Sequence, residues 1–432
     1  MNEQENINKI RDYIKSGEKK REDFSIGVEM EHFTISNEDG KSISYYGENG
    51  VGETLDFLKE KYGFKAAQEN GYTLSLDSDL VDVSTEPGSQ FEIAIKAQRT
   101  VADLEKIYLD FMSKVLEHIE EKDQSLVALG YHPVTKIEDI KILPKKRYDH
   151  MFNYFKSQGN MAHNMMKGTA SVQTTIDFEN EEDFKRKYFL LNVFTPVFYA
   201  MFDNAFIFQG NPTKLHTIRQ KIWENTDVDR SGLFEIAFDE DLSYEKYARK
   251  IWNTPTIFRP EGKGTVSTGN KTLKEVAEEV ELDDELIFHA LSIVFPDIRV
   301  KKYIEVRMFD AVSYPLNFSI PAFIKGLFYD EDNLKKLYEL GKNTSYDEAL
   351  KAKSDIIDQG LEAKYLGKTL KELSKILFEM SYNGLDEGDR KYLEPLRPFV
   401  ENSITPRDEF EKIYKKDGIL KAIDSVKIKP EA

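Results

Sequence analysis

Two glutamates separated by one residue lie in a segment that otherwise has the pattern of a buried strand. The segment is SIGVEMEHFTIS, residues 25–36, and its acids are Glu29 and Glu31. Side chains alternate along a strand, so the two carboxylates share one face, roughly 7 Å apart, while Ile26 and Val28 share the other. Like charges at that distance repel unless a positive group lies between them. A divalent cation would satisfy both carboxylates, and for one such pair alone an exposed, solvated strand face is the alternative.

Polar side chains also share one face of three further segments that alternate as strands do: STEPGSQFEIAI, SVQTTIDF and VKKYIEVRMFD. Glu86 precedes a Pro-Gly pair that is typical of a turn, and the other polar residues follow in the strands. They are Gln90, Glu92, Ser171, Gln173, Thr175, Asp177, Tyr303, Glu305 and Arg307. Because neighbouring strands lie roughly 5 Å apart, these polar faces can meet across a sheet. A solvated face usually mixes in lysines, so inward-facing acids explain the pattern better than solvation does.

A cluster of carboxylates with amide and hydroxyl neighbours offers only oxygen ligands to a metal ion. Mg²⁺ and Mn²⁺ prefer such ligands, and zinc does not. In proteins Mg²⁺ usually bridges carboxylates and the phosphates of a substrate. The acid-bearing strands therefore favour a magnesium site next to a phosphate-bearing substrate.

Composition narrows the class of protein. A net charge of −17 argues against nucleic-acid binding, because phosphate backbones are held by lysine and arginine. The chain has no cysteine, which excludes disulfides, thiolate metal sites and a cysteine nucleophile. No apolar run is long enough to cross a bilayer, and the charged start MNEQENINKIRDYIK lacks an apolar signal core. We therefore expect a soluble cytoplasmic protein with small-molecule partners and no membrane or nucleic-acid partner.

Periodicity predicts an α+β protein in which helices are inserted between the strands of an antiparallel or mixed sheet. The predicted strands are Ser25–Ile35, Tyr72–Val83, Gln90–Ile95, Ser125–Gly130, Ser171–Phe178 and Val300–Phe309. The predicted helices are Thr54–Lys61, Thr100–Glu121, Glu181–Phe206, Leu273–Val280, Asp283–Leu291 and Asn317–Phe328. We expect one catalytic unit over residues 1–432, with a core of about 24–331 and a mostly helical C-terminal part of about 332–432.

Seven segments, taken in order, resemble motifs of glutamate–cysteine ligases of the plant and proteobacterial type. They are IGVEMEHF, STEPGSQFEI, LPKKRYDHM, TASVQTTIDF, FTPVFYAMFDNAFIFQG, IRQKIWENTDVDRSG and LSIVFPDIRVKKYIEVR. The fifth motif is degraded, because Ala205 and Phe206 replace the serine and proline of the family. The resemblance covers most of the chain, roughly Phe24 to Glu331.

The resemblance implies a curved β-sheet funnel surrounded by helices, as in the glutamine synthetase-like fold. It also implies an ATP-dependent ligase that joins the γ-carboxylate of L-glutamate to the amine of L-cysteine through a γ-glutamyl phosphate, the first step of glutathione synthesis. ATP is then a co-substrate, and Mg²⁺, or in its place Mn²⁺, is the cofactor. The implied metal ligands are Glu29, Glu31, Glu86, Glu92 and Glu305, with Gln173 as a further candidate.

Cationic side chains near these motifs are candidates for substrate contacts. Arg307 follows Glu305 by two residues on the same face, so we expect it to stabilise the transferring phosphate as the catalytic residue. Arg219 could hold the α-carboxylate of glutamate in a bidentate fork, with Trp223 one helical turn away. A structural ion pair beside a core aromatic is the alternative for Arg219, Trp223 and Arg230. The predicted substrate- and ATP-binding residues are Lys145, Arg147, Tyr148, Gln90, Arg219, Trp223 and Arg230, the first two and the last as phosphate contacts.

One departure from the family leaves the acceptor open. Met308 and Phe309 stand where the family more often has Gly-Ala, in a segment expected beside the pocket. A related ligase that activates glutamate but uses another amine is therefore one alternative. A catalytically silent binding protein of the same fold is another, although the intact acids argue against it, because buried carboxylates without a partner are costly.

Overall fold

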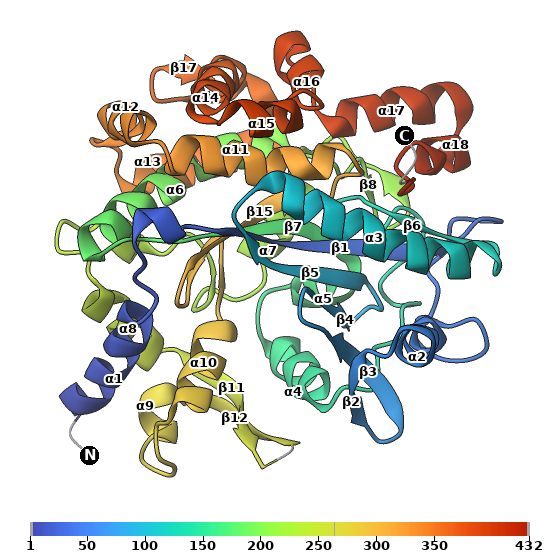
Figure 1. Ribbon diagram of the computed structural model, residues 1–432, viewed down its shortest axis with the longest axis horizontal. Coiled ribbons are helices and arrows are strands. Elements are labelled where there is room, and N and C mark those ends of the chain that lie inside the picture. Colours follow the sequence, from blue (N-terminus) through green and yellow to red (C-terminus); the bar gives the residue numbers. More distant parts are fainter. Residues whose placement is uncertain (1–2, 263, 430–432) are drawn as a thin grey trace.

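In the described part of the chain, residues 3–262 and 264–429 of a computed structural model, nine strands form one antiparallel sheet (Figure 1). Their order is β14-β15-β7-β1-β5-β4-β3-β2, and β6 pairs with the far end of β1. The central strand β1 thus brings together β5 and β7, which are far apart in the sequence. The strands are β1 (Ile26–Ser36), β2 (Lys65–Glu69), β3 (Tyr72–Asp77), β4 (Val81–Thr85), β5 (Phe91–Gln98), β6 (Gln124–Val127), β7 (Ser171–Ile176), β14 (Ile298–Val300) and β15 (Ile304–Asp310).

Three helices cover one face of the sheet (Figure 1): α3 (Val101–Glu120), α6 (Glu181–Met201) and α11 (Ser319–Phe328). Helix α3 packs on β5 and β6, α6 on β15, and α11 on β7 and β1. Helix α3 begins where the Thr100 side chain accepts a hydrogen bond from the Asp103 amide, which satisfies one of the free N–H groups of the first turn. Its buried side chains recur at helical spacing, which gives it one apolar face for the sheet.

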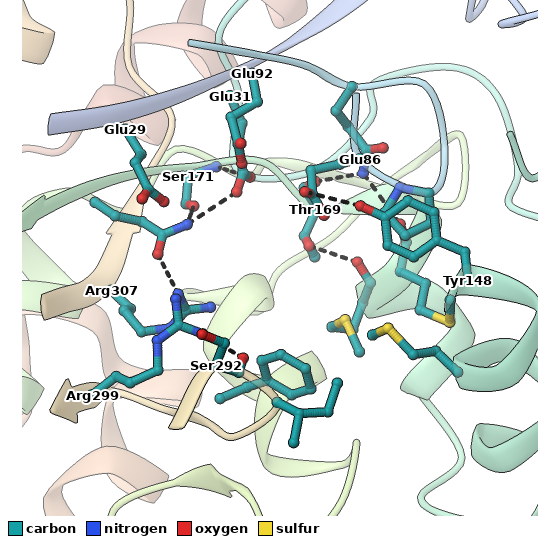
Figure 2. A pocket seen from close by; sticks show the side chains of 18 of the residues that line it. Glu29, Glu31, Glu86, Glu92, Tyr148, Thr169, Ser171, Ser292, Arg299 and Arg307 are labelled. Carbon is teal, nitrogen blue, oxygen red and sulfur yellow. Dashed lines mark hydrogen bonds between the residues drawn. The ribbon is translucent and has the colours of Figure 1, made fainter. Parts of the chain in front are cut away.

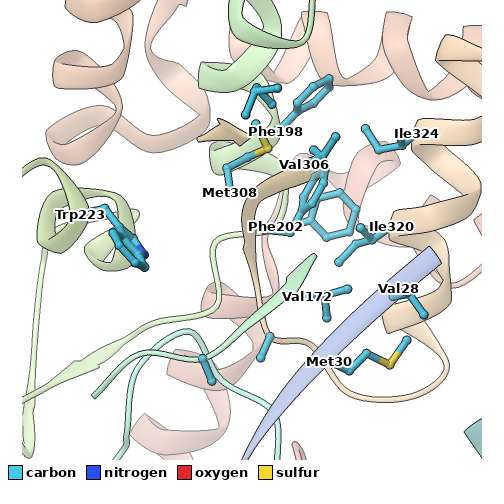
Figure 3. Close-up of a cluster of buried hydrophobic side chains, with 14 of the residues drawn as sticks. Val28, Met30, Val172, Phe198, Phe202, Trp223, Val306, Met308, Ile320 and Ile324 are labelled. Atoms are coloured by element: carbon cyan, nitrogen blue, oxygen red, sulfur yellow. The ribbon is translucent and has the colours of Figure 1, made fainter. Parts of the chain in front are cut away.

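The apolar sides of the strands meet α6 and α11 in the core (Figure 3). The side chains concerned are no more than 2% exposed, and burying each one contributes about 1.5–3 kcal/mol to folding. They are Val28, Met30, Val172, Val306, Met308, Phe198, Phe202, Ile320 and Ile324. Because strand side chains alternate, the same strands turn their polar residues to the opposite face.

A second layer lies on that opposite face, below the sheet in Figure 1. Helix α4 packs on both strands of a hairpin, α10 packs on its first strand, and α5 packs on α7. The elements of this layer are α4 (Lys146–Tyr154), α5 (Ala162–Gly168), α7 (Ile218–Glu224), α10 (Asp284–Ser292) and the hairpin of β11 (Pro255–Glu261) and β12 (Gly264–Thr272). The polar face of the sheet and this layer enclose the cavity described below.

The C-terminal part is helical and packs on the helices of the first face, at the top of Figure 1. Helices α12, α13 and α14 all contact α6. None of the described helices is both long and apolar enough to span a membrane. The remaining helices are α1 (Glu3–Lys15), α2 (Val51–Tyr62), α8 (Tyr244–Trp252), α9 (Leu273–Val276), α12 (Glu331–Gly341), α13 (Tyr346–Gln359), α14 (Leu370–Gly384), α15 (Glu387–Arg390), α16 (Arg397–Asn402), α17 (Pro406–Asp417) and α18 (Ile419–Asp424).

The predicted α+β class with an antiparallel sheet is confirmed, but two predicted strands are in fact hairpins. Tyr72–Val83 divides into β3 and β4, and Val300–Phe309 covers the end of β14 and most of β15. In the second hairpin the turn at residues 301–303 places Arg299 opposite Glu305. The sequence prediction also missed α1, α4 and the β11–β12 hairpin, whose patterns are short or mixed in polarity.

Met308 and Phe309 do not lie beside the cavity, which corrects the expectation from the sequence. The pairing of β15 with β7 shifts between Val306 and Phe309, so Arg307 and Met308 together lie opposite Gln173. Such a bulge breaks the strict alternation of faces, and both Met308 and Phe309 are fully buried in the core. The Phe309 ring packs against Phe198 and Phe202, at 5.8 and 5.0 Å between centroids.

We expect Met308→Ala to lower the free energy of unfolding by about 2–5 kcal/mol, because it leaves a cavity in a packed core. Urea titration followed by circular dichroism measures this change. The matched control is Val228→Ala, since Val228 is 90% exposed and its truncation should change stability by no more than about 0.5 kcal/mol. Equal stabilities of the two variants would show that Met308 is not a core residue.

Candidate active site

A cavity of about 310 Å³ lies between the polar face of the sheet and the second layer, within the range of small-molecule sites (Figure 2). Carboxylates from three neighbouring parts of the sheet line one wall. Glu29 and Glu31 come from β1, Glu92 from β5, and Glu86 from the turn after β4. Figure 2 shows these acids facing Arg299 and Arg307 across the cavity. The cavity therefore has an acidic wall and a basic wall.

Strand register brings the acids of the first wall together. Glu31 lies directly opposite Glu92 in the pairing of β1 with β5, and Glu29 lies opposite Gln173 in the pairing of β1 with β7. The amide of Ser171 donates to Glu31 Oε2 at 2.8 Å, and Gln173 Nε2 donates to Glu31 Oε1 at 3.1 Å. These hydrogen bonds hold the Glu31 carboxylate in place, but their neutral donors cannot neutralise the negative charge of the acidic wall.

The electrostatic state of this wall follows from burial and mutual repulsion. Burial, and then the charge of Glu86, raises the pKa of Glu31 to about 7. The pKa of Glu92 is raised well above its usual value by burial and by Glu86, Glu29 and Glu31. Burial and the charge of Glu305 also raise the pKa of Glu29. The acidic wall thus binds protons unless another cation takes their place.

The basic wall is centred on Glu305, which is fully buried. Arg299 Nε and Arg307 Nη1 both donate to Glu305 Oε2, the latter at 3.1 Å, and Lys301 Nζ lies 3.5 Å from Oε1. Burial alone would raise the pKa of Glu305, but these three cations hold it well below its usual value. Arg307 also donates to Gln173 Oε1, which links the basic wall to the acidic one. Glu305 therefore carries the charge that keeps the cationic side chains together.

Helix α7 adds a fourth cation, Arg219, which has free donor atoms. Arg219 is 2% exposed and donates Nη2 to the backbone oxygen of Arg307 at 2.9 Å. Its Nε and Nη1 atoms are buried without a hydrogen-bond partner, as is Nε1 of Trp223. The centroid of the Trp223 ring lies near both arginines, 6.0 Å from Cζ of Arg219 and 5.9 Å from Cζ of Arg307. Both residues line the cavity, so these donors are available to an anion.

The start of α4 completes the cavity next to Glu86. The Tyr148 hydroxyl donates to Glu86 Oε1 at 3.2 Å, and Arg147 Nη2 donates to that hydroxyl at 2.8 Å. Gln90 stabilises the turn, because it accepts from the Gly88 amide and donates to the Thr169 carbonyl. These contacts hold Glu86 in place against the rest of the wall.

Most of the residues predicted from the sequence converge on this cavity. The predicted residues that line it are Glu29, Glu31, Glu86, Glu92, Gln90, Arg147, Tyr148, Arg219, Trp223 and Arg307. Lys145 lies just outside, with Nζ 5.3 Å from the centroid of the Tyr148 ring, and burial together with Arg147 lowers its pKa to about 7. Glu305 lies behind the wall that it organises.

Arg230 is not brought to the cavity, which corrects its prediction as a phosphate contact. It is fully buried, and Nε donates to Asp227 Oδ2 at 2.6 Å. Its Nη1 atom donates to the carbonyls of Pro255 and Ile293, and Nη2 donates to the Tyr154 hydroxyl. All of its donor atoms are thus used in a structural ion pair and its surrounding hydrogen bonds.

Sequence reasoning missed several residues of the site, among them Arg299 and Lys301. Both belong to the quoted segment LSIVFPDIRVKKYIEVR, and their two-residue spacing continues to Glu305 and Arg307. That shared spacing was the available signal. His289 also lines the cavity, but its Nε2 lies 2.6 Å from the Phe258 carbonyl and burial lowers its pKa to about 4, so it is neutral.

The donor set of the acidic wall fits Mg²⁺ or Mn²⁺. It offers carboxylate oxygens whose mutual repulsion a divalent cation would relieve. On the basic wall, Glu305 Oε1 is a buried oxygen without a hydrogen-bond donor, although Lys301 Nζ lies 3.5 Å away. Within residues 3–262 and 264–429, no group of three or more His, Cys, Asp or Glu side chains is already close enough to hold an ion. Metal ligation by Glu29, Glu31, Glu86, Glu92 and Glu305 therefore stays a prediction.

Repulsion on the acidic wall predicts an unusual effect on stability. An unfolded glutamate has a pKa of about 4.3. Because the folded pKa of Glu92 is raised, the folded state holds more protons above that pH, and stability falls as the pH rises. We therefore expect Glu92→Gln to stabilise the ligand-free protein at pH 8 by about 1 kcal/mol, with no gain at pH 4.

Urea titration at the two pH values measures the effect of Glu92→Gln. The control is Glu48→Gln, because Glu48 is exposed and its neutralisation should leave stability unchanged at both pH values. A loss of stability in Glu92→Gln at pH 8 would mean that its charge is already compensated in the free protein.

Comparison with known proteins shows which family the chain belongs to. A family model described as glutamate–cysteine ligase family 2 (GCS2) matches residues 25–424. The chain is 26% identical over 412 residues to the chloroplastic glutamate–cysteine ligase A of Oryza sativa subsp. indica, covering 93% of this chain and 83% of the relative. It is 26% identical over 413 residues to the chloroplastic glutamate–cysteine ligase of Arabidopsis thaliana, covering 93% and 78%.

A solved structure shows a similar fold. The glutamate–cysteine ligase of Francisella tularensis, crystallised in complex with AMP, superposes with a TM-score of 0.57 at 13% identity, over 93% of this chain and 88% of the other. The family model extends across both the acid-bearing strands and the C-terminal helices. This chain belongs to glutamate–cysteine ligase family 2.

Proposed function

We propose that this protein is an ATP-dependent glutamate–cysteine ligase that forms γ-glutamylcysteine, the first step of glutathione synthesis. The observation that carries the proposal is the cavity itself, in which the family's acid-bearing strands face buried guanidinium groups. The relatives at 26% identity are named glutamate–cysteine ligases, and the Francisella tularensis enzyme was solved with AMP.

The reaction must first activate a carboxylate, because oxide is too poor a leaving group for direct attack by an amine. An oxygen of the glutamate γ-carboxylate attacks the γ-phosphorus of ATP, and the bond from that phosphorus to the β,γ-bridging oxygen breaks to release ADP. The amine of cysteine then attacks the γ-carbonyl carbon of the acyl phosphate. Inorganic phosphate leaves, the amine loses a proton, and an amide remains. The barrier to the first step is mainly charge, so cationic side chains contribute most of the catalysis.

The basic wall matches the needs of that first step. Arg307 projects into the cavity between Gln173 and Trp223, where its guanidinium can follow the charge of the transferring phosphoryl group. Arg219 has two unsatisfied buried donors directly beside it, a geometry suited to the α-carboxylate of glutamate. Arg147 lies across the cavity beside Glu86 and is suited to the phosphates of the nucleotide.

Glu29, Glu31, Glu86 and Glu92 would hold Mg²⁺ or Mn²⁺, with Glu305 as a further predicted ligand. When bound, the ions would neutralise charge on the ATP phosphates. The residues of this chain hold the acids at fixed positions through the register of β1 with β5 and β7, and the hydrogen bonds of Ser171 and Gln173 orient Glu31.

The structure removes the specific reason for preferring another acceptor. That reason was the larger Met308-Phe309 pair, and both side chains are buried in the core and do not line the cavity. Cysteine is therefore the proposed acceptor, and a related ligase that uses a different amine is the alternative.

One experiment tests the proposal. Purified protein is incubated with Mg-ATP and glutamate, single amino acids are added, and phosphate release and product mass are followed. Phosphate release that depends on cysteine, with a product of the mass of γ-glutamylcysteine, is the expected result. Release with another amine would identify a different acceptor, and no release with any amine would leave a catalytically silent binding protein of this fold.

A further inference from the structure

A buried lysine of the C-terminal helices lies next to the helix that carries Arg219. Lys353 belongs to α13, outside the part of the chain that holds the acid-bearing strands, and its side chain is 1% exposed. Its Nζ atom is hydrogen-bonded to Oδ2 of Asp297 and lies 3.3 Å from Oε1 of Glu224. Burial disfavours the charge of Lys353, but Asp297 and Glu224 together raise its pKa above the usual value. The two carboxylates therefore favour the charged form of this buried lysine.

The two partners of Lys353 lead directly to the basic wall of the cavity. Glu224 is the last residue of α7 and follows Trp223. Gln220 of the same helix donates Nε2 to both Glu224 Oε1, at 2.9 Å, and the backbone oxygen of Lys353, at 2.6 Å. Two residues of α7, Gln220 and Glu224, thus contact Lys353 of α13.

The other partner reaches the strand that carries Arg307. Asp297 precedes β14, and its carbonyl accepts a hydrogen bond from the Arg307 amide at 3.0 Å. Its Oδ1 accepts a further hydrogen bond of 2.6 Å from the Tyr199 hydroxyl of α6. Arg219 connects α7 to the same strand, because it donates a hydrogen bond to the Arg307 carbonyl at 2.9 Å. Contacts therefore join Glu224, Lys353, Asp297, Arg307 and Arg219 in that order, and helix α7, which carries both Arg219 and Glu224, closes the ring.

From this ring we infer that Lys353 is a positioning residue of the active site, which fixes the distance and angle between Arg219 and Arg307 through Glu224 and Asp297. Lys353 is not among the residues that line the cavity, so it acts through the two arginines. The inference rests on the proposed ligase function where it concerns kinetics. It assigns a role to the C-terminal helices, namely to hold α7 against β15 when anionic substrates pull on both arginines.

The first test compares Lys353→Met with Lys187→Met. Lys187 is a matched control, because it is also a fully buried lysine paired with an acid, Asp183, but lies away from the cavity. Both variants should lose thermal stability, since each removes the buried lysine that pairs with a buried carboxylate. Only Lys353→Met is expected to raise the KM for glutamate roughly tenfold and to lower kcat roughly a hundredfold, as small misplacements of reacting groups do. Equal kinetic effects in the two variants would overturn the inference.

Two further variants separate positioning from folding. In Lys353→Met/Asp297→Asn the unpaired buried charge is removed, so stability should return toward that of the wild type while the raised KM remains. Wild-type KM and kcat in this double variant would show that the network is only structural. Should neither Lys353 variant fold, Glu224→Gln decides, because Glu224 is partly exposed and tolerates the change; an unaltered KM for glutamate would then overturn the inference.

Hydrogen exchange gives a readout that does not depend on turnover. We expect the amides of α7 to exchange faster in Lys353→Met, but not in Lys187→Met, because α7 loses the contact between Glu224 and Lys353. Unchanged exchange in α7 would overturn the inference even if the wild-type protein proved to have a different activity. Absence of ATP turnover in the wild type, in contrast, would count against the proposed function and not against the positioning role.

Discussion

Arg307→Met is expected to lower kcat by roughly a factor of 10³ or more, with a much smaller change in the KM for ATP. The guanidinium lies on the basic wall, is held by Glu305 and Gln173, and packs beside Trp223. Burial, and then the neighbouring Arg299, lowers the pKa of Arg307, so its positive charge is disfavoured in the free protein. A bound anion would stabilise that charge. A group that strengthens its contacts as the phosphoryl group transfers acts on kcat more than on binding. Initial rates at saturating ATP and glutamate measure the loss.

A pair of lysine substitutions supplies the control. Arg307→Lys keeps the charge but loses the planar fork, so it should still lower kcat by roughly a hundredfold. Arg230→Lys makes the same change in an arginine that is also buried but lies outside the cavity. It should lower the thermal midpoint and leave kcat unchanged below that temperature. If Arg307→Met retains kcat within about tenfold, Arg307 does not stabilise the transferring phosphate.

The faces of the acid-bearing strands could be predicted from the sequence, because a period of two leaves only one choice once the apolar side is known. Glu29 and Glu31 do share the face opposite Val28 and Met30, as the alternation predicts. Which strands are neighbours could not be predicted in this way. The pairing of β1 with both β5 and β7 joins distant segments, and only the structure reveals it.

Prediction failed where the role of a residue depends on contacts with other elements, which a local sequence pattern does not reveal. Arg219 and Arg230 lie in one motif, and both are buried, yet one has free donors in the cavity while the other is fully bonded to Asp227 and backbone carbonyls. No spacing rule distinguishes them, since the partners come from other elements. The bulge at Arg307 and Met308 is a second case, because one extra residue on a strand reverses which side chains reach the core.

The charge on the basic wall also could not be derived from the acids alone. Glu305 was grouped with the other glutamates because it shares their strand pattern, but the turn at residues 301–303 folds Arg299 and Lys301 back onto it. An experiment must therefore decide whether Glu305 holds the arginines in place or binds a metal ion. If Glu305 only holds the arginines, Glu305→Gln should lower kcat and leave the Mg²⁺ requirement unchanged. If Glu305 binds the metal ion, the variant should raise that requirement.

Glu29→Gln is the variant in which we expect the largest change in metal dependence. Glu29 lies between Ala94 of β5 and Gln173 of β7, faces the cavity, and has a pKa raised by burial and by the charge of Glu305. Loss of one carboxylate removes a charge and an oxygen ligand together, so the Mg²⁺ concentration for half-maximal rate should rise roughly 10–100-fold.

Initial rates against free Mg²⁺, at saturating ATP and glutamate, measure the Mg²⁺ requirement. The matched control is Asp177→Asn, because Asp177 is also a buried acid at the end of a sheet strand but is bonded to Lys19 and Ser25, outside the cavity. Its Mg²⁺ requirement should equal that of the wild type. Because charge repulsion on the acidic wall is the physical reason for a cation there, an unchanged requirement in Glu29→Gln would mean that protons, and not Mg²⁺, neutralise these carboxylates during turnover.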